Sequence, residues 1–162
     1  MTKNIIPTIQ NITSKKLIGK HLTMSFADNK TFALWNSFMP HRKEIRNAID
    51  AITMYSLQIY NRDFFVKFNS HTEFEKWAAV EVSDFNTIPD RMENLTIPGG
   101  QYAVFYYIGS HNNGQDIFGY IFGEWLPASG YELDDRPHFE ILGPKYKNGD
   151  PESEEEIWIP IK

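Results

Sequence analysis

Three glutamates in aromatic-rich parts of the chain have the clearest chemical potential. They are Glu81, Glu140 and Glu156. A carboxylate in a cleft with aromatic walls complements a flat or cationic organic ligand, because ring faces attract cations and one buried charge fixes the ligand's orientation. Burial would also raise the pKa of such a carboxyl group, as a general acid or base near neutral pH requires. These residues are therefore candidates for ligand binding or for catalysis.

Other common site chemistries have little support. The chain contains no cysteine, which removes thiol nucleophiles, disulfides and thiolate metal ligands. Its five histidines show neither paired ligand spacing nor an HExxH arrangement, so we expect no metal site. A serine nucleophile elbow, a phosphate-binding loop and a dinucleotide-binding glycine motif are also missing, so we expect no cofactor.

Composition indicates one globular domain that binds neither nucleic acid directly nor membranes. The 162 residues are 41% hydrophobic and 15% aromatic, which suffices to bury a continuous core. The net charge is -5, and the best basic cluster, residues 41–46, is too short for the basic stripe of a nucleic-acid binder. The sequence shows no secretory signal and no apolar run of membrane-spanning length, so we expect a cytoplasmic protein.

The first half of the chain predicts a strand, a helix and two more strands. Residues 17–26 alternate as a strand does, and a helix capped at residues 28–29 then ends near Pro40. Strand candidates follow at residues 53–60 and 76–82. The apolar face of the helix consists of Phe32, Trp35, Phe38 and Met39.

The second half repeats this order. Residues 101–108 are rich in strand formers, residues 112–114 lead into a helix that ends at Pro127, and strands follow at residues 138–142 and 155–161. The apolar face of this helix, which we expect to pack in the core, consists of Ile117, Phe118, Ile121, Phe122, Trp125 and Leu126.

The repeated order indicates an internal duplication with its seam at residues 98–100. We expect residues 1–13 to form an N-terminal extension and residues 14–162 to form one domain, with repeats over about 14–97 and 98–162. The fold class is then α+β. An antiparallel sheet carries helices on one face, and the other face is free to form a cleft between the repeats.

Strand alternation assigns side chains to the two faces of that sheet. Ile157 and Ile159 point to the core beneath the helices, so Glu156 and Trp158 point to the helix-free face. We assign the remaining candidate site residues to the same helix-free face: Trp77, Glu81, Tyr102, His138 and Glu140, with Tyr106 or Tyr107. Solvated acids on an exposed sheet face are the alternative interpretation of the glutamates.

Four segments, taken in order, resemble a known family. They are residues 102–109 (Tyr-Ala-Val-Phe-Tyr-Tyr-Ile-Gly), 120–131 with Trp-Leu-Pro at 125–127, 137–140 with Phe-Glu at its end, and 156–161 (Glu-Ile-Trp-Ile-Pro-Ile). Together they resemble the GyrI-like small-molecule-binding family, also known as the effector-binding domain of AraC-type regulators. The resemblance covers about residues 14–162 and is strongest after Gly99.

The resemblance implies a duplicated strand-helix-strand-strand fold with a ligand cleft between the repeats. By position, it implies that Glu140 lies at the centre of the pocket and that Trp77, Tyr106 and Trp158 form aromatic walls. Many relatives join this domain to a helix-turn-helix. Because fewer than 20 residues precede the first predicted strand here, we expect a stand-alone form.

Three functions follow from the residues and the resemblance. The leading prediction is the binding of amphipathic, aromatic or cationic small molecules, as in multidrug recognition or sequestration. An alternative is hydrolysis of toxic, cyclopropane-type electrophiles, in which Glu140 activates water and Tyr106 assists, since some stand-alone relatives look like such protective proteins. A further alternative is a gyrase-interacting protein that uses the acidic segment 150–156, since the founding member of the family inhibits gyrase.

Overall fold

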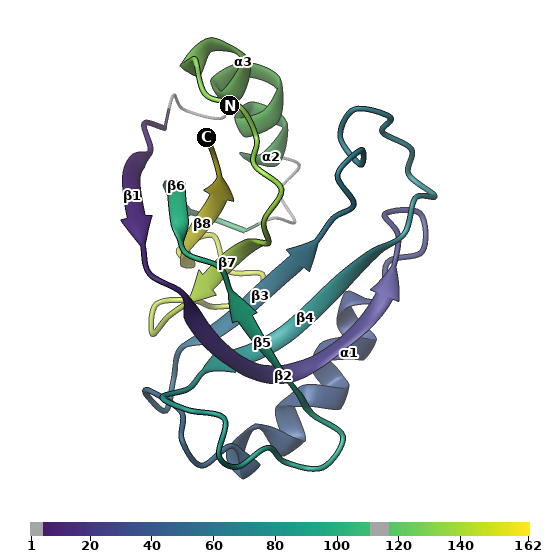
Figure 1. Ribbon diagram of the computed structural model, residues 1–162, viewed down its shortest axis with the longest axis vertical. Helices are drawn as coiled ribbons and strands as arrows, with labels where there is room; N and C mark the ends of the chain where they lie inside the picture. The colour runs from purple at the N-terminus through teal and green to yellow at the C-terminus, as the bar shows by residue number, and fades with distance from the viewer. Residues whose placement is uncertain (1–4, 111–116) are drawn as a thin grey trace.

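The computed structural model describes residues 5–110 and 117–162, which form one curled antiparallel sheet and two helical segments (Figure 1). The strands are β1 (Thr8–Ile12), β2 (Lys15–Met24), β3 (Met54–Ile59), β4 (Phe74–Glu81), β5 (Glu93–Ile97), β6 (Gly100–Ile108), β7 (His138–Leu142) and β8 (Glu154–Pro160). Their order across the sheet is β1-β6-β8-β7-β3-β4-β2-β5. From the centre outward, the first half places β3, then β4, then β2, and the second half places β7, then β8, then β6. This symmetric order confirms the duplicated α+β architecture.

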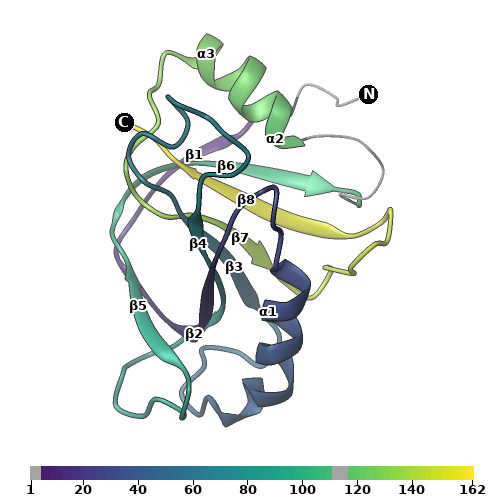
Figure 2. The same cartoon turned by 90° about the vertical axis from the view of Figure 1, so that its right-hand side faces the viewer.

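Two helical segments lie over the sheet. The first is α1 (Thr31–Phe38), which continues into the 3-10 turn η1 (Met39–Glu44). The second runs without a break through α2 (Ile117–Tyr120), the π-helical η3 (Ile121–Trp125) and α3 (Leu126–Ser129). In Figure 2 the two segments stand apart from each other on the sheet.

Both helical segments cover the same face of the sheet. Residues paired across antiparallel strands share a face, and the register connects Ile157 with Glu140, Glu140 with Ser56, and Ser56 with Ala78. Ile157 packs beneath α2 and η3, whereas Ala78 packs beneath α1. The helices therefore flank the central strands on one side, as the sequence predicted.

The predicted helices differ from the observed ones in detail. Phe32 is 81% exposed, and the buried residues of α1 are Leu34 and Phe38. The second segment does not end at Pro127. The π-helical η3 precedes this proline, with the Leu126 N–H bonded to the Ile121 carbonyl oxygen, and the helix continues through α3. The segment ends at Gly130, whose φ of 80° is the left-handed conformation of a helix C-cap. Residues 112–114, which are expected to lead into this helix, lie outside the described residues.

Two strands of the sheet have no counterpart in the sequence prediction. β1 comes from the expected N-terminal extension and pairs with β6, and β5 precedes the Pro98–Gly100 seam and pairs with β2. Both are short strands of five residues at the two edges of the sheet. Most of their side chains are exposed, so they lack the alternation that marks a half-buried strand.

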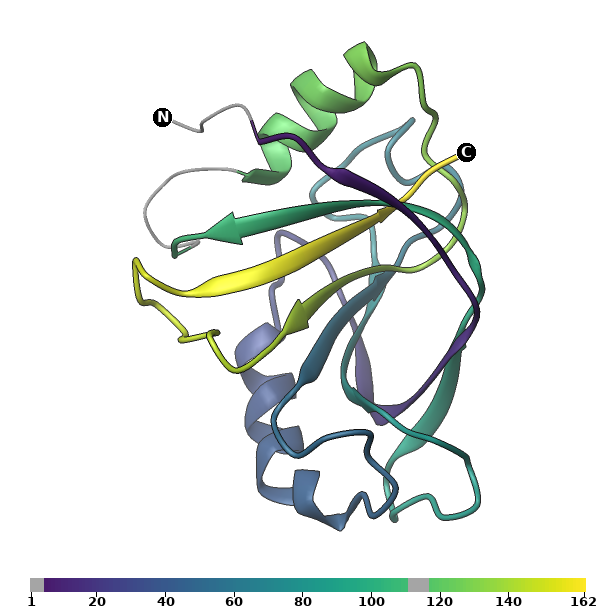
Figure 3. The same cartoon turned by 90° about the vertical axis from the view of Figure 1, so that its left-hand side faces the viewer.

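The helix-free face is filled by a second core, which we call the inner core. The sheet curls so that β2 and β5 return across this face (Figure 3), and one apolar cluster joins all the strands from β2 to β8. Gly19 allows β2 to approach β4 closely, since a Cβ atom there would lie 2.1 Å from the Ala78 carbonyl oxygen. The expectation of an open cleft on the helix-free face is therefore wrong.

Candidate functional site

The principal cleft lies on the helix-bearing face, between the two helical segments. It has two lobes with cavity volumes of about 620 and 610 Å³, and both lobes are lined by Asn29, Thr31, Lys76 and Glu140. The phenylalanine lobe is further lined by Met24, Phe26, Gln58, Tyr60, Phe65, Phe68, Phe74, Phe118, Gly119 and Phe122. The tryptophan lobe is further lined by Phe32, Trp35, Met39, Met54, Ser56, Leu142, Tyr146, Asn148 and Glu155. Each helical segment thus supplies a wall.

A strip of polar side chains, here called the polar floor, crosses β4, β3 and β7 beneath this cleft. Gln58 of β3 pairs with Lys76 of β4, and Ser56 of β3 pairs with Glu140 of β7. Lys76 and Gln58 are each only 8% exposed. Glu155 of β8 extends the strip into the tryptophan lobe and is 4% exposed. The floor therefore combines buried groups of both charges with an amide.

Burial sets the protonation of the groups around Glu140. The pKa of Lys76 is lowered by desolvation, against the opposing attraction of Glu140 and Glu155. Desolvation raises the pKa of Tyr60, and the negative charge of Glu140 raises it further. The pKa of Tyr146 is raised by desolvation and by both carboxylates. The two tyrosine hydroxyls therefore stay protonated at neutral pH and can donate hydrogen bonds.

Glu140 is the predicted site residue at the centre of the cleft, but the predicted set around it is divided between two faces. Alternation correctly paired Glu140 with His138, yet the pair points to the helix-bearing face. Glu81 lies on the opposite face, where it accepts a hydrogen bond of 2.8 Å from the Tyr55 hydroxyl. Glu156, also opposite, accepts one of 3.0 Å from Trp158 Nε1. The three glutamates therefore do not form one site.

The predicted aromatic walls lie in the inner core instead. Trp77 and Trp158 are 4% and 5% exposed and pack with Phe139 and Tyr102. Tyr106, half exposed on the helix-free side of β6, donates its hydroxyl hydrogen to Glu154. None of these residues lines the cleft. Tyr107 lies on the helix-bearing face, packed against α2 and η3.

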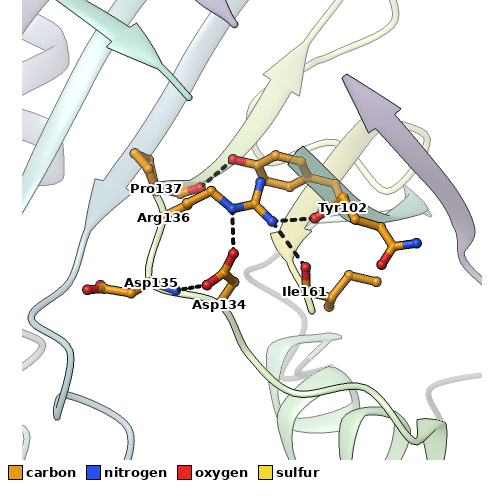
Figure 4. Close-up of polar contacts among 7 residues, drawn as sticks. Tyr102, Asp134, Asp135, Arg136, Pro137 and Ile161 are labelled. Carbon is orange, nitrogen blue, oxygen red and sulfur yellow. Dashed lines mark hydrogen bonds and ion pairs between the residues drawn. The ribbon is translucent and has the colours of Figure 1, made fainter. Parts of the chain in front are cut away.

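Tyr102 takes part in a structural contact with Arg136 (Figure 4). The guanidinium carbon lies 4.6 Å from the centre of the Tyr102 ring. Arg136 donates from Nε to Asp134 at 2.8 Å and from Nη2 to the carbonyl oxygens of Gln101 and Ile161 at 2.6 and 3.1 Å. One side chain thereby joins the segment before β7 to β6 and to the end of the chain.

His138 lies beside the cleft rather than in it. It is 5% exposed and stacks on Phe65, with ring centres 5.5 Å apart. Together with Tyr60 and Phe122 it also lines a neighbouring cavity of about 580 Å³. Desolvation lowers its pKa to about 3, and the charge of Arg136 adds to this effect. His138 is therefore neutral at physiological pH.

The sequence prediction missed most of the residues that line the cleft. The helical pattern places Phe118 and Phe122 in the core, and it gives no role to Lys76 or Gln58. The sequence does hold a signal. Lys76 alternates with the same phase as the core-facing Ala78 and Val80 of β4, and Ser56 and Gln58 share one phase on β3. Polar residues on a core-facing strand phase indicate a solvent-filled gap between the covering helices.

The described residues offer neither a cluster of metal ligands nor a membrane-spanning helix. Among residues 5–110 and 117–162, no group of three or more histidine, aspartate and glutamate side chains is placed to hold a metal ion. In the same part of the chain, no helix is long and apolar enough to cross a membrane.

Residues 7–162 match the GyrI-like small molecule binding domain. The chain belongs to this family. The GyrI-like match begins at the approach to β1, so it includes that edge strand as well as both repeats. No curated protein sequence matches the chain.

Solved structures share the GyrI-like fold of this chain at low sequence identity. A putative bacterial transcription regulation protein from Staphylococcus aureus MU50 is 18% identical over 98% of this chain and 99% of its own, with a TM-score of 0.67. SAV2435 bound to tetraphenylphosphonium is 18% identical over 96% and 93%, with a TM-score of 0.71. A hydrolase from Listeria innocua is 10% identical over 97% and 92%, with a TM-score of 0.60. At these identities the likeness establishes the fold alone.

Proposed function

We propose that this GyrI-like protein binds amphipathic aromatic small molecules, cationic ones among them, in the cleft between its helical segments. The observation that carries the proposal is the position of Glu140, which lines both lobes of a cleft with aromatic walls. The walls bury the apolar body of a ligand, and the carboxylate fixes its charged group. SAV2435, which shares the fold, was solved with a lipophilic aromatic cation.

The test is calorimetric titration with tetraphenylphosphonium. We expect Glu140→Gln to weaken binding about tenfold or more, because the substitution keeps the shape of the side chain and removes its charge. Glu124→Gln is the matched control, since Glu124 is exposed on η3 and does not line the cleft. Equal affinities of wild type and Glu140→Gln would refute the role of Glu140, and absence of binding by wild type would count against the proposal itself.

A second candidate function is hydrolysis of strained electrophiles. The favouring observation is that Tyr60 and Glu140 both line the phenylalanine lobe. The charge of Glu140 adds to the desolvation that raises the pKa of the Tyr60 hydroxyl. In this reaction Glu140 takes a proton from water, the oxygen attacks a ring carbon, the carbon–carbon bond breaks, and Glu140 returns the proton to the released carbon. Tyr106, the tyrosine that the sequence predicts for this role, lies on the opposite face of the sheet and does not line the cleft, so Tyr60 replaces it in the hypothesis.

Mass spectrometry of a cyclopropane-bearing compound incubated with the protein tests this function. Turnover requires a product that is one water heavier and more than one product per protein molecule, lost in Glu140→Gln. Recovery of the intact compound in complex with the protein would instead leave binding as the whole activity.

The gyrase interaction stays a prediction, with fewer exposed charges than the sequence suggested. Within the acidic segment, Glu155 is buried in the polar floor. Glu154 contacts Tyr106 and lies 3.6 Å from the Lys145 amino group. Glu156 accepts a hydrogen bond from Trp158 Nε1. Asp150 and Glu152 remain as acids without such burial or pairing in this segment, so mimicry of a phosphate backbone has little support.

A further inference from the structure

Lys76 is the least expected residue in the cleft, and it has a second polar neighbour. Its side chain reaches both lobes from β4 although the residue is only 8% exposed. Gln58 is its direct partner on β3, and directly paired side chains on one face have Cβ atoms roughly 5 Å apart. An ammonium and an amide side by side in an apolar cleft form a recognition pair for a carboxylate or another strong acceptor.

The polar groups of the floor are distributed unevenly along the cleft. Gln58 lines only the phenylalanine lobe, Glu155 lines only the tryptophan lobe, and Glu140 lies between them with Lys76. A purely anionic ligand would meet two carboxylates and one ammonium, so it is disfavoured. A purely cationic ligand is attracted by Glu140 but brings no acceptor for Lys76 and Gln58 and places a like charge beside Lys76.

We propose that the cleft selects zwitterionic aromatic ligands, whose acidic group binds Lys76 and Gln58 while their cationic group binds Glu140. This inference rests on the proposed function and specifies the ligand class for the same site. A ligand carboxylate at Lys76 replaces the hydration that burial removes, which is consistent with the lowered pKa of its amino group. The aromatic body then occupies the phenylalanine lobe.

Two dyes that differ by one ester test the inference. Rhodamine 19 is a carboxylic acid and is zwitterionic at neutral pH, whereas rhodamine 6G is its ethyl ester and is cationic. We expect wild-type protein to bind rhodamine 19 at least fivefold more tightly by fluorescence anisotropy, although the ethyl group favours the ester on hydrophobic grounds. Lys76→Met should reverse the preference, and Lys76→Arg should keep it.

Lys20 provides a matched control for the Lys76 variants. Lys20→Met removes a lysine from the same face of the sheet, where Lys20 donates to Ser37 of α1 outside the cleft, and it should leave the preference unchanged. Equal binding of both dyes by wild type, or equal effects of Lys76→Met on both, overturns this inference and leaves the proposed function standing. Binding of neither dye by a folded wild type overturns both.

Discussion

Burial on the cleft face disfavours the charged form of two basic side chains, His138 and Lys76. Both side chains lie on the helix-bearing side of the sheet, and Gln58 pairs with both of their positions. Desolvation lowers both pKa values. Lys76 opens into the cleft, where a ligand can stabilise its ammonium group, but His138 is enclosed by Tyr60, Phe65 and Phe122. His138 therefore affects stability rather than ligand binding.

We predict that His138 makes the protein sensitive to acid. Between its unfolded pKa of roughly 6.5 and its folded pKa of about 3, the unfolded chain binds a proton that the folded protein does not. The free energy of unfolding therefore falls as the pH falls through this range, by about 2.5 kcal/mol from this group at pH 4.5. Urea unfolding at pH 7.5 and 4.5 should show a smaller loss for His138→Phe than for wild type. His71→Gln, at an exposed position, should retain the full loss, and identical losses in all three proteins would contradict the prediction.

At this scale, sequence reasoning identified one central residue of the cleft and missed its neighbours. Glu140 was found because the Phe-Glu pair at residues 139–140 matches a family pattern. Alternation could state that Glu140 and Phe139 point in opposite directions, but it could not state which direction faces the helices. That depends on the register with β3 and β8, which joins distant parts of the chain.

Arg136 is the residue that connects the most elements. Its contacts hold the segment before β7 against β6 and the end of the chain. Gly100 completes the arrangement, since a Cβ atom there would lie 2.5 Å from Arg136 Nη1, and its φ of 150° disfavours other residues. The guanidinium fork matches acceptors on three separate segments, which a single ammonium cannot do.

We expect Arg136→Lys to lower the free energy of unfolding by about 2 kcal/mol, because charged hydrogen bonds are lost from a mostly buried group. Gly100→Ala should also destabilise the protein. Part of its cost should disappear in the Arg136→Lys background, because the clash with the guanidinium is then gone. Urea unfolding of the two single variants and the double variant measures this coupling. Strictly additive effects would show that the glycine serves only its own backbone conformation.

The elements themselves were largely predictable, and the exceptions have physical causes. β3, β4, β6, β7 and β8 coincide closely with the predicted strands because their residues are apolar or alternate. The sequence does not predict β1 and β5, because these edge strands bury few side chains. The second helical segment passes Pro127 because the π-helical η3 restarts the helix there, and no rule of composition places a π-helix.

The inner core occupies the helix-free face of the sheet, whereas the helix-bearing face carries two further cores beneath the helices and the cleft between them. The inner core on the helix-free face joins strands from both halves, with Leu57 and Tyr102 fully buried. The cleft on the other face is lined largely by side chains from the helical segments and the loop after β3. Stability and recognition are therefore expected to respond to different substitutions.

A crossed pair of variants tests this separation. Trp158→Phe in the inner core should lower the free energy of unfolding by about 1–2 kcal/mol and change the affinity for tetraphenylphosphonium less than twofold. Phe68→Ala at the 57% exposed edge of the phenylalanine lobe should leave stability nearly unchanged and weaken binding about fivefold. Thermal melts and calorimetry measure both effects. Weaker binding by Trp158→Phe together with unchanged binding by Phe68→Ala would reverse the assignment of the two faces.

The inner core also bears on how such a protein diversifies. A chain whose sheet is held by cores behind and beside the cleft is free to exchange the side chains that line the cleft without first losing its structure. Replacement of a wall phenylalanine, or of the lysine on the floor, changes which compound fits and leaves the scaffold able to fold. New ligand preferences can therefore arise by single steps, each passing through a stable protein.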